Sequence, residues 1–235
     1  MSRMIKTCGI IVPAYNEEAS LTRVLKEIRQ QSRSWHIVVV DDGSTDKTGD
    51  IARLCGVTVI RQQTRMGVGA AVRRGFVYAK AHTWDIAIQI DADGEHDPRF
   101  VALLLKDMQR GVNVVIGSRF LQGTQHQRLL RFAGRRLCMV IVKLLFGCDI
   151  YDPTSGFRAF DRRAIDFLST HYPADFPEPE SLVMLLTHGF TVIEVPVVVR
   201  PRLGGKSSIT LWKSITLAIT VPWGMFSQYV RTRFL

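Results

Sequence analysis

Short apolar segments alternate with longer amphipathic segments through the first half of this chain. The apolar segments are rich in Ile and Val, and we expect strands over residues 7–12, 36–40, 57–61, 85–90 and 113–117. Between them we expect helices over residues 17–31, 45–54, 68–81 and 98–110. This alternation predicts an α/β fold in which flanking helices cover a mostly parallel central sheet.

The second half of the chain is less regular. We expect a helix over residues 129–146, a loop over the proline-rich residues 172–180 and a strand over residues 191–199. No repeat period or low-complexity tract appears. We therefore expect one domain over residues 1–208 and a C-terminal helical appendage over residues 209–235.

The composition supports a core and excludes some classes of protein. The chain has 235 residues, of which 46% are hydrophobic, and this is enough for a sizeable core. Its four cysteines lie far apart without a CxxC pair, which argues against a disulfide framework and against a zinc site. No long apolar region of a signal peptide precedes the first expected strand, so we expect a cytoplasmic location.

The net charge of +10 is unevenly distributed. Residues 108–148 contain seven Arg or Lys and no acidic residue, and the chain after Glu194 contains six more and again no acidic residue. Such asymmetry indicates anionic partners, among them a nucleotide diphosphate, a phosphorylated acceptor, an anionic membrane surface or nucleic acid. Nucleic acid is disfavoured, because only Phe120 and Phe132 supply aromatic rings between Arg110 and Lys143.

Two carboxylates follow the expected strand at residues 85–90. Asp91 and Asp93 stand two positions apart, at the edge of the sheet where open α/β proteins bind ligands. Carboxylates this close repel one another unless a cation neutralises them, and their hard oxygens suit Mg²⁺ or Mn²⁺ shared with a substrate phosphate. The alternative is an acidic turn that caps a helix opening at Pro98.

The ends of the other expected strands are also polar. Tyr15 and Glu17 follow the first strand, where a flat ring can stack on a nucleobase and a carboxylate can accept hydrogen bonds from base or ribose. Asp41 and Asp42 follow the second strand, where one of them can bind a base N–H. Capping of the following helices explains each pair singly. The convergence of three such strand ends on one sheet edge favours a nucleotide and metal site.

Six motifs, taken in order, resemble those of a known enzyme family. The resemblance is to the inverting glycosyltransferases of family 2 with the GT-A fold, and within them to the dolichyl/polyprenyl-phosphate mannose synthase-like branch. The motifs are Val12-Pro-Ala-Tyr-Asn-Glu17, Val40-Asp-Asp-Gly-Ser-Thr-Asp46, Asp91-Ala-Asp93, Gly117-Ser-Arg-Phe120, Asp152-Pro-Thr-Ser-Gly-Phe-Arg158 and Glu194-Val-Pro-Val197.

The resemblance implies roles for the donor side of a site. The residues implied to contact the donor base and ribose are Pro13, Tyr15, Glu17, Asp41 and Asp42. The residues implied to hold Mg²⁺ or Mn²⁺ on the donor diphosphate are Asp91, Asp93 and Glu95. Two positions depart from the family pattern, with Arg65 where Asn is usual and Glu95 where Gln is usual.

The resemblance also implies an acceptor side and a set of catalytic residues. Arg119, Arg135 and Ser155 match positions at the acceptor phosphate. The residues implied to serve catalysis are Asp93, Arg202 and Glu180. Arg202 would reach the diphosphate from the segment after the last expected strand, and with the metal it would stabilise charge on the leaving phosphate.

The implied reaction moves a hexose, with inversion, from a GDP-mannose or UDP-glucose type of donor to a polyprenyl or dolichyl phosphate. A lipid phosphate is already anionic, so Arg119 and Arg135 would position it without a strong general base. The alternative acceptor is a saccharide hydroxyl, for which Asp93, Glu178 or Glu180 would take the proton. A remote alternative is a nucleotidyltransferase, which usually carries a Gly-rich basic loop where this chain has residues 13–17.

The C-terminal segment has its own pattern. Residues 214–230 contain no charge and are flanked by Lys213 and Arg231. We expect a helix at a membrane surface, with its aromatic residues at headgroup depth. The aromatic residues are Trp212, Trp223, Phe226 and Tyr229. A spanning helix, or a helix packed on the domain or on a second subunit, stays open. We expect peripheral attachment at the cytoplasmic membrane face.

Overall fold

The computed structural model describes residues 7–108, 110–121, 129–202 and 211–234. The strands there are β1 (Cys8–Ala14), β2 (His36–Asp41), β3 (Thr58–Arg61), β4 (Ile86–Gln89), β5 (Val114–Ser118), β6 (Arg158–Asp161) and β7 (Val192–Pro196). They form one sheet in the order β3-β2-β1-β4-β6-β5-β7. Only β6 among them runs antiparallel to its neighbours, β4 and β5. The predicted mostly parallel sheet is confirmed.

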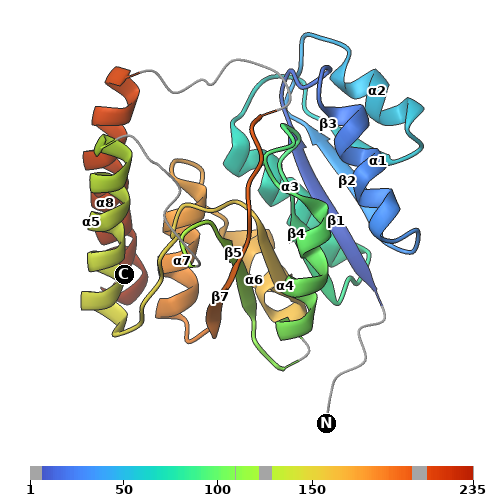
Figure 1. The fold of residues 1–235 in the computed structure, drawn as a ribbon. Coiled ribbons are helices and arrows are strands. Elements are labelled where there is room, and N and C mark those ends of the chain that lie inside the picture. Colours follow the sequence, from blue (N-terminus) through green and yellow to red (C-terminus); the bar gives the residue numbers. More distant parts are fainter. Residues whose placement is uncertain (1–6, 109, 122–128, 203–210, 235) are drawn as a thin grey trace.

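Helices cover both faces of the sheet (Figure 1). They are α1 (Leu21–Gln31), α2 (Thr48–Leu54), α3 (Val68–Ala81), the short 3₁₀ helix η1 (Pro98–Phe100), α4 (Val101–Met108), α5 (Leu129–Phe146), α6 (Arg162–His171), α7 (Pro177–Thr187) and α8 (Leu211–Phe234). The core on one face includes residues of α1, α2 and α4, and the core on the other face includes residues of α3 and α5–α8.

Apolar strands separate these two cores. All seven residues of β1 are buried, because its side chains alternate between the faces. Ile10 and Val12 belong to the core with α1, whereas Ile11 belongs to the core with α3. A strand buried on both faces has to be apolar along its whole length, which is why Ile and Val dominate these segments.

Three elements differ from the sequence predictions. β6 and α6 were not predicted, and α7 begins at Pro177, inside the predicted loop. Proline fits the first turn of a helix, because the missing N–H has no intrahelical partner there. β6 has only four residues and starts with Arg158, so it lacks the apolar run that revealed the other strands.

The C-terminal helix α8 lies beside α5 at one end of the sheet, as Figure 1 shows. It also packs against α7, and its Met225 is fully buried in the core. Across the described residues, no helix combines the length and the apolar character that crossing a bilayer requires.

Candidate active site

A cavity of about 620 Å³ lies at the carboxyl edge of the parallel strands. The residues that line it lie at or after the ends of β1, β2, β3 and β4, in α3, before the antiparallel β6, in α7 and in the segment after β7. The predicted site residues among them are Pro13, Tyr15, Glu17, Asp42, Asp91, Asp93 and Arg202. The topology therefore brings together side chains that are separated by up to 189 positions in the chain.

Asp91 and Asp93 face this cavity at the end of β4. Desolvation, followed by repulsion from the Asp93 carboxylate, raises the pKa of Asp91 to about 7. A carboxylate pair of this kind gains from a cation that neutralises it. Within the described ranges, no group of three or more acidic, His or Cys side chains is arranged to hold a metal ion alone. Two hard carboxylates do fit Mg²⁺ or Mn²⁺ that takes its other ligands from a diphosphate and water.

Arg202 reaches into the cavity from the segment after β7. Its Nη2 lies 2.6 Å from Asp93 Oδ2, its Nε lies 3.4 Å from Glu95 Oε1, and its Nη1 lies 4.0 Å from Glu17 Oε1. The three carboxylates hold the guanidinium beside the place where a diphosphate and a cation would meet. This arrangement supplies positive charge that can stabilise a leaving phosphate.

Asp42 lies at the β2 end of the cavity and is nearly fully buried. Its Oδ1 accepts hydrogen bonds from Gln62 Nε2 (2.8 Å) and the Met66 backbone N–H (2.7 Å), and its Oδ2 accepts one from the Gly67 N–H (2.8 Å). A carboxylate offers about four lone-pair positions. Three of those positions at Asp42 serve to fix the turn before α3.

Tyr15 also lines the cavity near this turn. The Arg65 guanidinium lies over its ring, 4.2 Å from the ring centroid, in a cation–π contact. Both residues line the cavity, so a nucleobase entering it would meet the aromatic ring and the guanidinium together. Glu17, beside them, accepts a 2.6 Å hydrogen bond from the Ser20 hydroxyl. Desolvation raises the pKa of Glu17.

Asp41 is not among the residues that line the cavity. Its side chain is fully buried, Oδ1 accepts a hydrogen bond from the Ser44 N–H, and Oδ2 lies 3.5 Å from Arg61 Nε. A methyl group on Gly49 of α2 would come within 2.6 Å of Oδ2. Asp41 therefore packs under the turn after β2, with α2 against it.

The cavity lining includes none of the predicted acceptor residues, Arg119, Arg135 and Ser155. Arg119 forms a bidentate ion pair with buried Asp152, at 2.7 Å on each oxygen, and donates to Thr154, which lines the cavity. The Arg135 guanidinium lies over the Phe120 ring, 3.9 Å from its centroid, and Arg119 lies 5.4 Å from the same centroid. Two guanidinium groups thus converge on one aromatic ring beside the cavity.

Ser155 occupies a buried position in the loop before β6. Its hydroxyl donates to the Gly117 carbonyl at 2.7 Å and accepts from the Phe157 N–H. Glu194 of β7 accepts hydrogen bonds from the N–H groups of Tyr151 and Asp152, each at 2.7 Å. Ser155 and Glu194 therefore fix the shape of the loop that carries Thr154 and Gly156 into the cavity.

Glu178, rather than Glu180, lines the cavity. Desolvation raises the pKa of Glu178, and the nearby Asp91 adds to this, whereas Arg158 opposes it. Glu180 turns toward α8, where a methyl group on Gly224 would come within 2.7 Å of its Oε1. Both carboxylates were candidates from the sequence. The rotation of α7 about its own axis decides that Glu178 faces the cavity and Glu180 does not.

Arg158 was not predicted as a site residue. Its guanidinium is fully buried and donates to the carbonyls of Ser155 (2.7 Å), Pro153 (2.8 Å) and Glu178 (3.0 Å). These bonds tie the loop before β6 to the first turn of α7. Arg158 is the last residue of the fifth of the six motifs, but nothing in the sequence indicated that its charge is buried.

His96, beside the acidic cluster, is packed rather than open to the cavity. Its ring stacks on Phe157, with centroids 5.1 Å apart, and its Nδ1 accepts from the Asp91 N–H. Burial lowers the pKa of His96 to about 4, so the ring is neutral near pH 7. A neutral, stacked ring indicates a structural role for His96.

Comparisons with known proteins add to this geometry. The family model described as glycosyl transferase family 2 matches residues 9–168. The polyprenol monophosphomannose synthase of Mycolicibacterium smegmatis is 29% identical over 237 residues, covering 95% of this chain and 89% of that protein. The undecaprenyl-phosphate mannosyltransferase of Micrococcus luteus is 29% identical over 214 residues, covering 85% and 86%.

A solved structure supports the fold. It is glucosyl-3-phosphoglycerate synthase from Mycobacterium tuberculosis in complex with Mn²⁺, uridine diphosphate and glucosyl-3-phosphoglycerate. The TM-score is 0.73 at 23% identity, and the match covers 95% of this chain and 80% of that chain. At this level of identity the likeness shows the GT-A architecture alone.

Proposed function

This chain belongs to glycosyl transferase family 2, and we propose that it transfers a hexose from a nucleotide diphosphate sugar to a polyprenyl-type lipid phosphate with inversion. Two of its relatives carry the names polyprenol monophosphomannose synthase and undecaprenyl-phosphate mannosyltransferase.

The observation that carries the acceptor assignment is the cationic pair beside the donor cavity. Arg119 and Arg135 converge on Phe120, and Arg119 touches the cavity wall through Thr154. Asp152 pairs with Arg119, and the Tyr151 carbonyl accepts a hydrogen bond from Arg135, so both guanidinium groups are held in place. Guanidinium groups bind a phosphate through charge-assisted hydrogen bonds, which a neutral hydroxyl does not offer.

The charges of the site define the chemistry. Asp91 and Asp93 would hold Mg²⁺ or Mn²⁺ on the donor diphosphate, and the cation supplies Lewis-acid stabilisation of the departing phosphate. Arg202 adds a guanidinium at the same place. Arg119 and Arg135 bind and orient the acceptor phosphate. Because its oxygen is already anionic, no proton has to be removed when it attacks the anomeric carbon.

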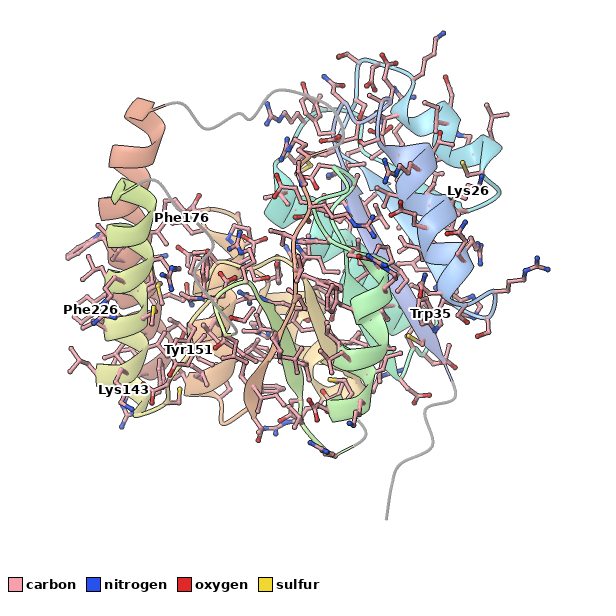
Figure 2. All side chains as sticks on the ribbon, in the orientation of Figure 1. Lys26, Trp35, Lys143, Tyr151, Phe176 and Phe226 are labelled. Atoms are coloured by element: carbon pink, nitrogen blue, oxygen red, sulfur yellow. The ribbon has the colours of Figure 1, made fainter. Side chains whose placement is uncertain are left out.

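Membrane attachment is part of the proposal. Neither α5 nor α8 contains an acidic residue, and each presents apolar side chains at helical spacing to solvent. These exposed residues are Leu137, Val140 and Leu144 on α5, and Trp223, Phe226 and Val230 on α8. Figure 2 shows Phe226 and Lys143 at the outer side of this helix pair. Apolar stripes on helices whose own charged residues are all basic suit an anionic bilayer surface.

A second candidate acceptor is a saccharide hydroxyl. The observation that favours it is Glu178, a carboxylate in the cavity whose pKa is raised by desolvation. Such a carboxylate can act as a general base toward a hydroxyl group. Under this alternative the enzyme family and the donor side of the site stay the same.

Product analysis tests the proposal. The protein is incubated with Mn²⁺, polyprenyl phosphate and a panel of GDP- and UDP-hexoses, and the lipids are examined by mass spectrometry. We expect a polyprenyl-phosphate hexose from at least one donor and none with the Asp93→Asn variant. Sugar transfer to an added saccharide, with no lipid-linked product from any donor, would overturn the acceptor assignment.

A further inference from the structure

Arg65 and Tyr15 lie together in the wall of the cavity. The Arg65 guanidinium lies over the Tyr15 ring, 4.2 Å from its centroid, and both residues line the cavity. Arg65 is exposed, so a ligand that enters the cavity can reach its guanidinium. A guanidinium carries five N–H donors in one plane. A cation–π contact does not pair these donors with an oxygen or nitrogen acceptor, so they stay available to a ligand.

The backbone at Arg65 is fixed from two sides. The next two N–H groups along the chain, those of Met66 and Gly67, donate to the Asp42 carboxylate at 2.7 Å and 2.8 Å. The turn after β2 packs against the same segment, since a methyl group on Gly43 would come within 2.8 Å of the Arg65 backbone nitrogen. The Arg65 side chain therefore starts from a defined place next to Asp42.

Asp42 can contact a nucleobase but cannot choose between guanine and uracil. One of the four lone-pair positions of its carboxylate remains after the bonds from Gln62, Met66 and Gly67. That position can accept one hydrogen bond from a ring N–H of a base in the cavity. Guanine and uracil both carry such an N–H group. The choice between them therefore falls to a neighbouring side chain.

The edge of the base next to that N–H group differs between guanine and uracil. In guanine the N–H group is followed by O6 and N7, two adjacent acceptors that a guanidinium binds with two of its donors. In uracil it is followed by O4 and a C–H group, which offer the guanidinium one acceptor. A guanidinium beside Asp42 thus gains more from guanine.

We propose that Arg65 is a specificity-determining residue that reads O6 and N7 of a guanine base. The donor is then a guanosine diphosphate sugar rather than a uridine diphosphate sugar. This inference rests on the proposed function, which leaves the base of the donor open.

Nucleotide binding tests the inference without any turnover. Isothermal titration calorimetry measures the affinity for guanosine diphosphate and for uridine diphosphate, each with Mn²⁺. The wild-type protein should bind guanosine diphosphate about tenfold more tightly than uridine diphosphate. Arg65→Met, which keeps an apolar stem and removes the donors, should lose about tenfold for guanosine diphosphate and less than about threefold for uridine diphosphate. Arg53→Met, on α2 and outside the cavity lining, is the matched control and should change neither affinity.

A guanosine diphosphate analogue with a C–H group in place of N7, 7-deazaguanosine diphosphate, tests the contact itself. The wild-type protein should bind it about fivefold more weakly than guanosine diphosphate, whereas Arg65→Met should bind the two nucleotides equally. Circular dichroism and thermal unfolding check that both variants are folded.

The outcomes separate this inference from the proposed function. Equal losses for the two diphosphates in Arg65→Met would show that the guanidinium acts on the ribose or the phosphates, and would overturn the inference. Wild-type protein that binds uridine diphosphate as tightly as guanosine diphosphate would also overturn it, and the proposed function would stand. Wild-type protein that binds neither nucleotide with Mn²⁺ would overturn both.

Discussion

Arg202 and Asp93 meet in the cavity with Nη2 and Oδ2 2.6 Å apart, although 109 positions separate them in the chain. The contact joins the end of β4 to the segment after β7, and so links the two halves of the molecule at the site. It places a fixed positive charge beside the carboxylates that are proposed to bind the cation.

The first prediction concerns this arginine. Arg202→Gln removes the charge that would stabilise the leaving phosphate, so kcat should fall about a hundredfold. The affinity for the nucleoside diphosphate should change much less, since the base and ribose contacts remain. Steady-state kinetics and calorimetric titration measure the two quantities. A kcat within threefold of the wild-type value would remove Arg202 from the reaction.

The second prediction concerns Asp42. Asp42→Asn replaces a carboxylate oxygen that accepts buried N–H bonds with an NH₂ group, which has to face another donor. We expect a loss of about 1–3 kcal/mol in the free energy of unfolding, measured by urea denaturation. Nucleotide affinity should fall too, because the turn that carries Arg65 would lose its anchor. Asp50→Asn, at a carboxylate of α2 that is 68% exposed and outside the cavity lining, serves as the control.

The third prediction concerns acid stability. Burial alone would raise the pKa of Asp97, but hydrogen bonds from Arg99 and Arg200 outweigh it and hold the pKa at about 2. Because the folded-state pKa lies below the ordinary value of 3.8, the stabilisation is complete above about pH 4 and is lost as the pH falls toward 2. It amounts to about 2 kcal/mol.

Urea unfolding of the wild-type protein and of Asp97→Asn at several pH values measures this effect. The wild-type protein should be the more stable at pH 6, and the difference should shrink between pH 4 and pH 2. A difference that stays constant over this range would show that ionised Asp97 does not stabilise the fold through Arg99 and Arg200.

The fourth prediction concerns the membrane surface. Replacing Trp223 and Phe226 together by Ser removes two exposed rings from α8. Binding to vesicles that contain phosphatidylglycerol should fall about tenfold or more, since each buried aromatic side chain contributes on the order of 1.5–3 kcal/mol. Leu54→Ser is the control, because Leu54 is 88% exposed on α2, at the other end of the sheet. Equal binding of both variants would place the membrane contact elsewhere.

The sequence predicted the donor side of the site better than the acceptor side. Tyr15, Asp42 and Asp91 follow apolar strands whose ends are local features, so their meeting at one sheet edge could be expected. Glu178 and Glu180 differ by two positions at the start of α7, and only the packing of α7 against α8 shows that Glu178 faces the cavity. The buried charge of Arg158 depends on the Pro153 carbonyl of the preceding loop and on the Glu178 carbonyl of α7, and no local pattern reveals this combination.

Strand β6 could not be predicted either, because its place in the fold also depends on contacts between distant parts of the chain. Its four residues insert between β4 and β5 and run against both, an order that depends on long-range pairing of Gln89 with Arg158 and of Ile116 with Arg158. The parallel strands were predicted because each is an apolar run bounded by turn residues. Strand β6 changes the order of the sheet, but its own sequence contains no apolar run from which the strand could be predicted.

The most direct test of the account is whether the phosphate of the lipid is the group that receives the sugar. Polyprenyl phosphate and the matching dephosphorylated polyprenol are offered separately, with Mn²⁺ and a labelled nucleotide sugar that supports turnover. We predict a labelled product from polyprenyl phosphate and none from the polyprenol, because Arg119 and Arg135 are proposed to bind an anion and the proposed reaction needs no general base. Glycosylation of the polyprenol at a comparable rate would contradict the account.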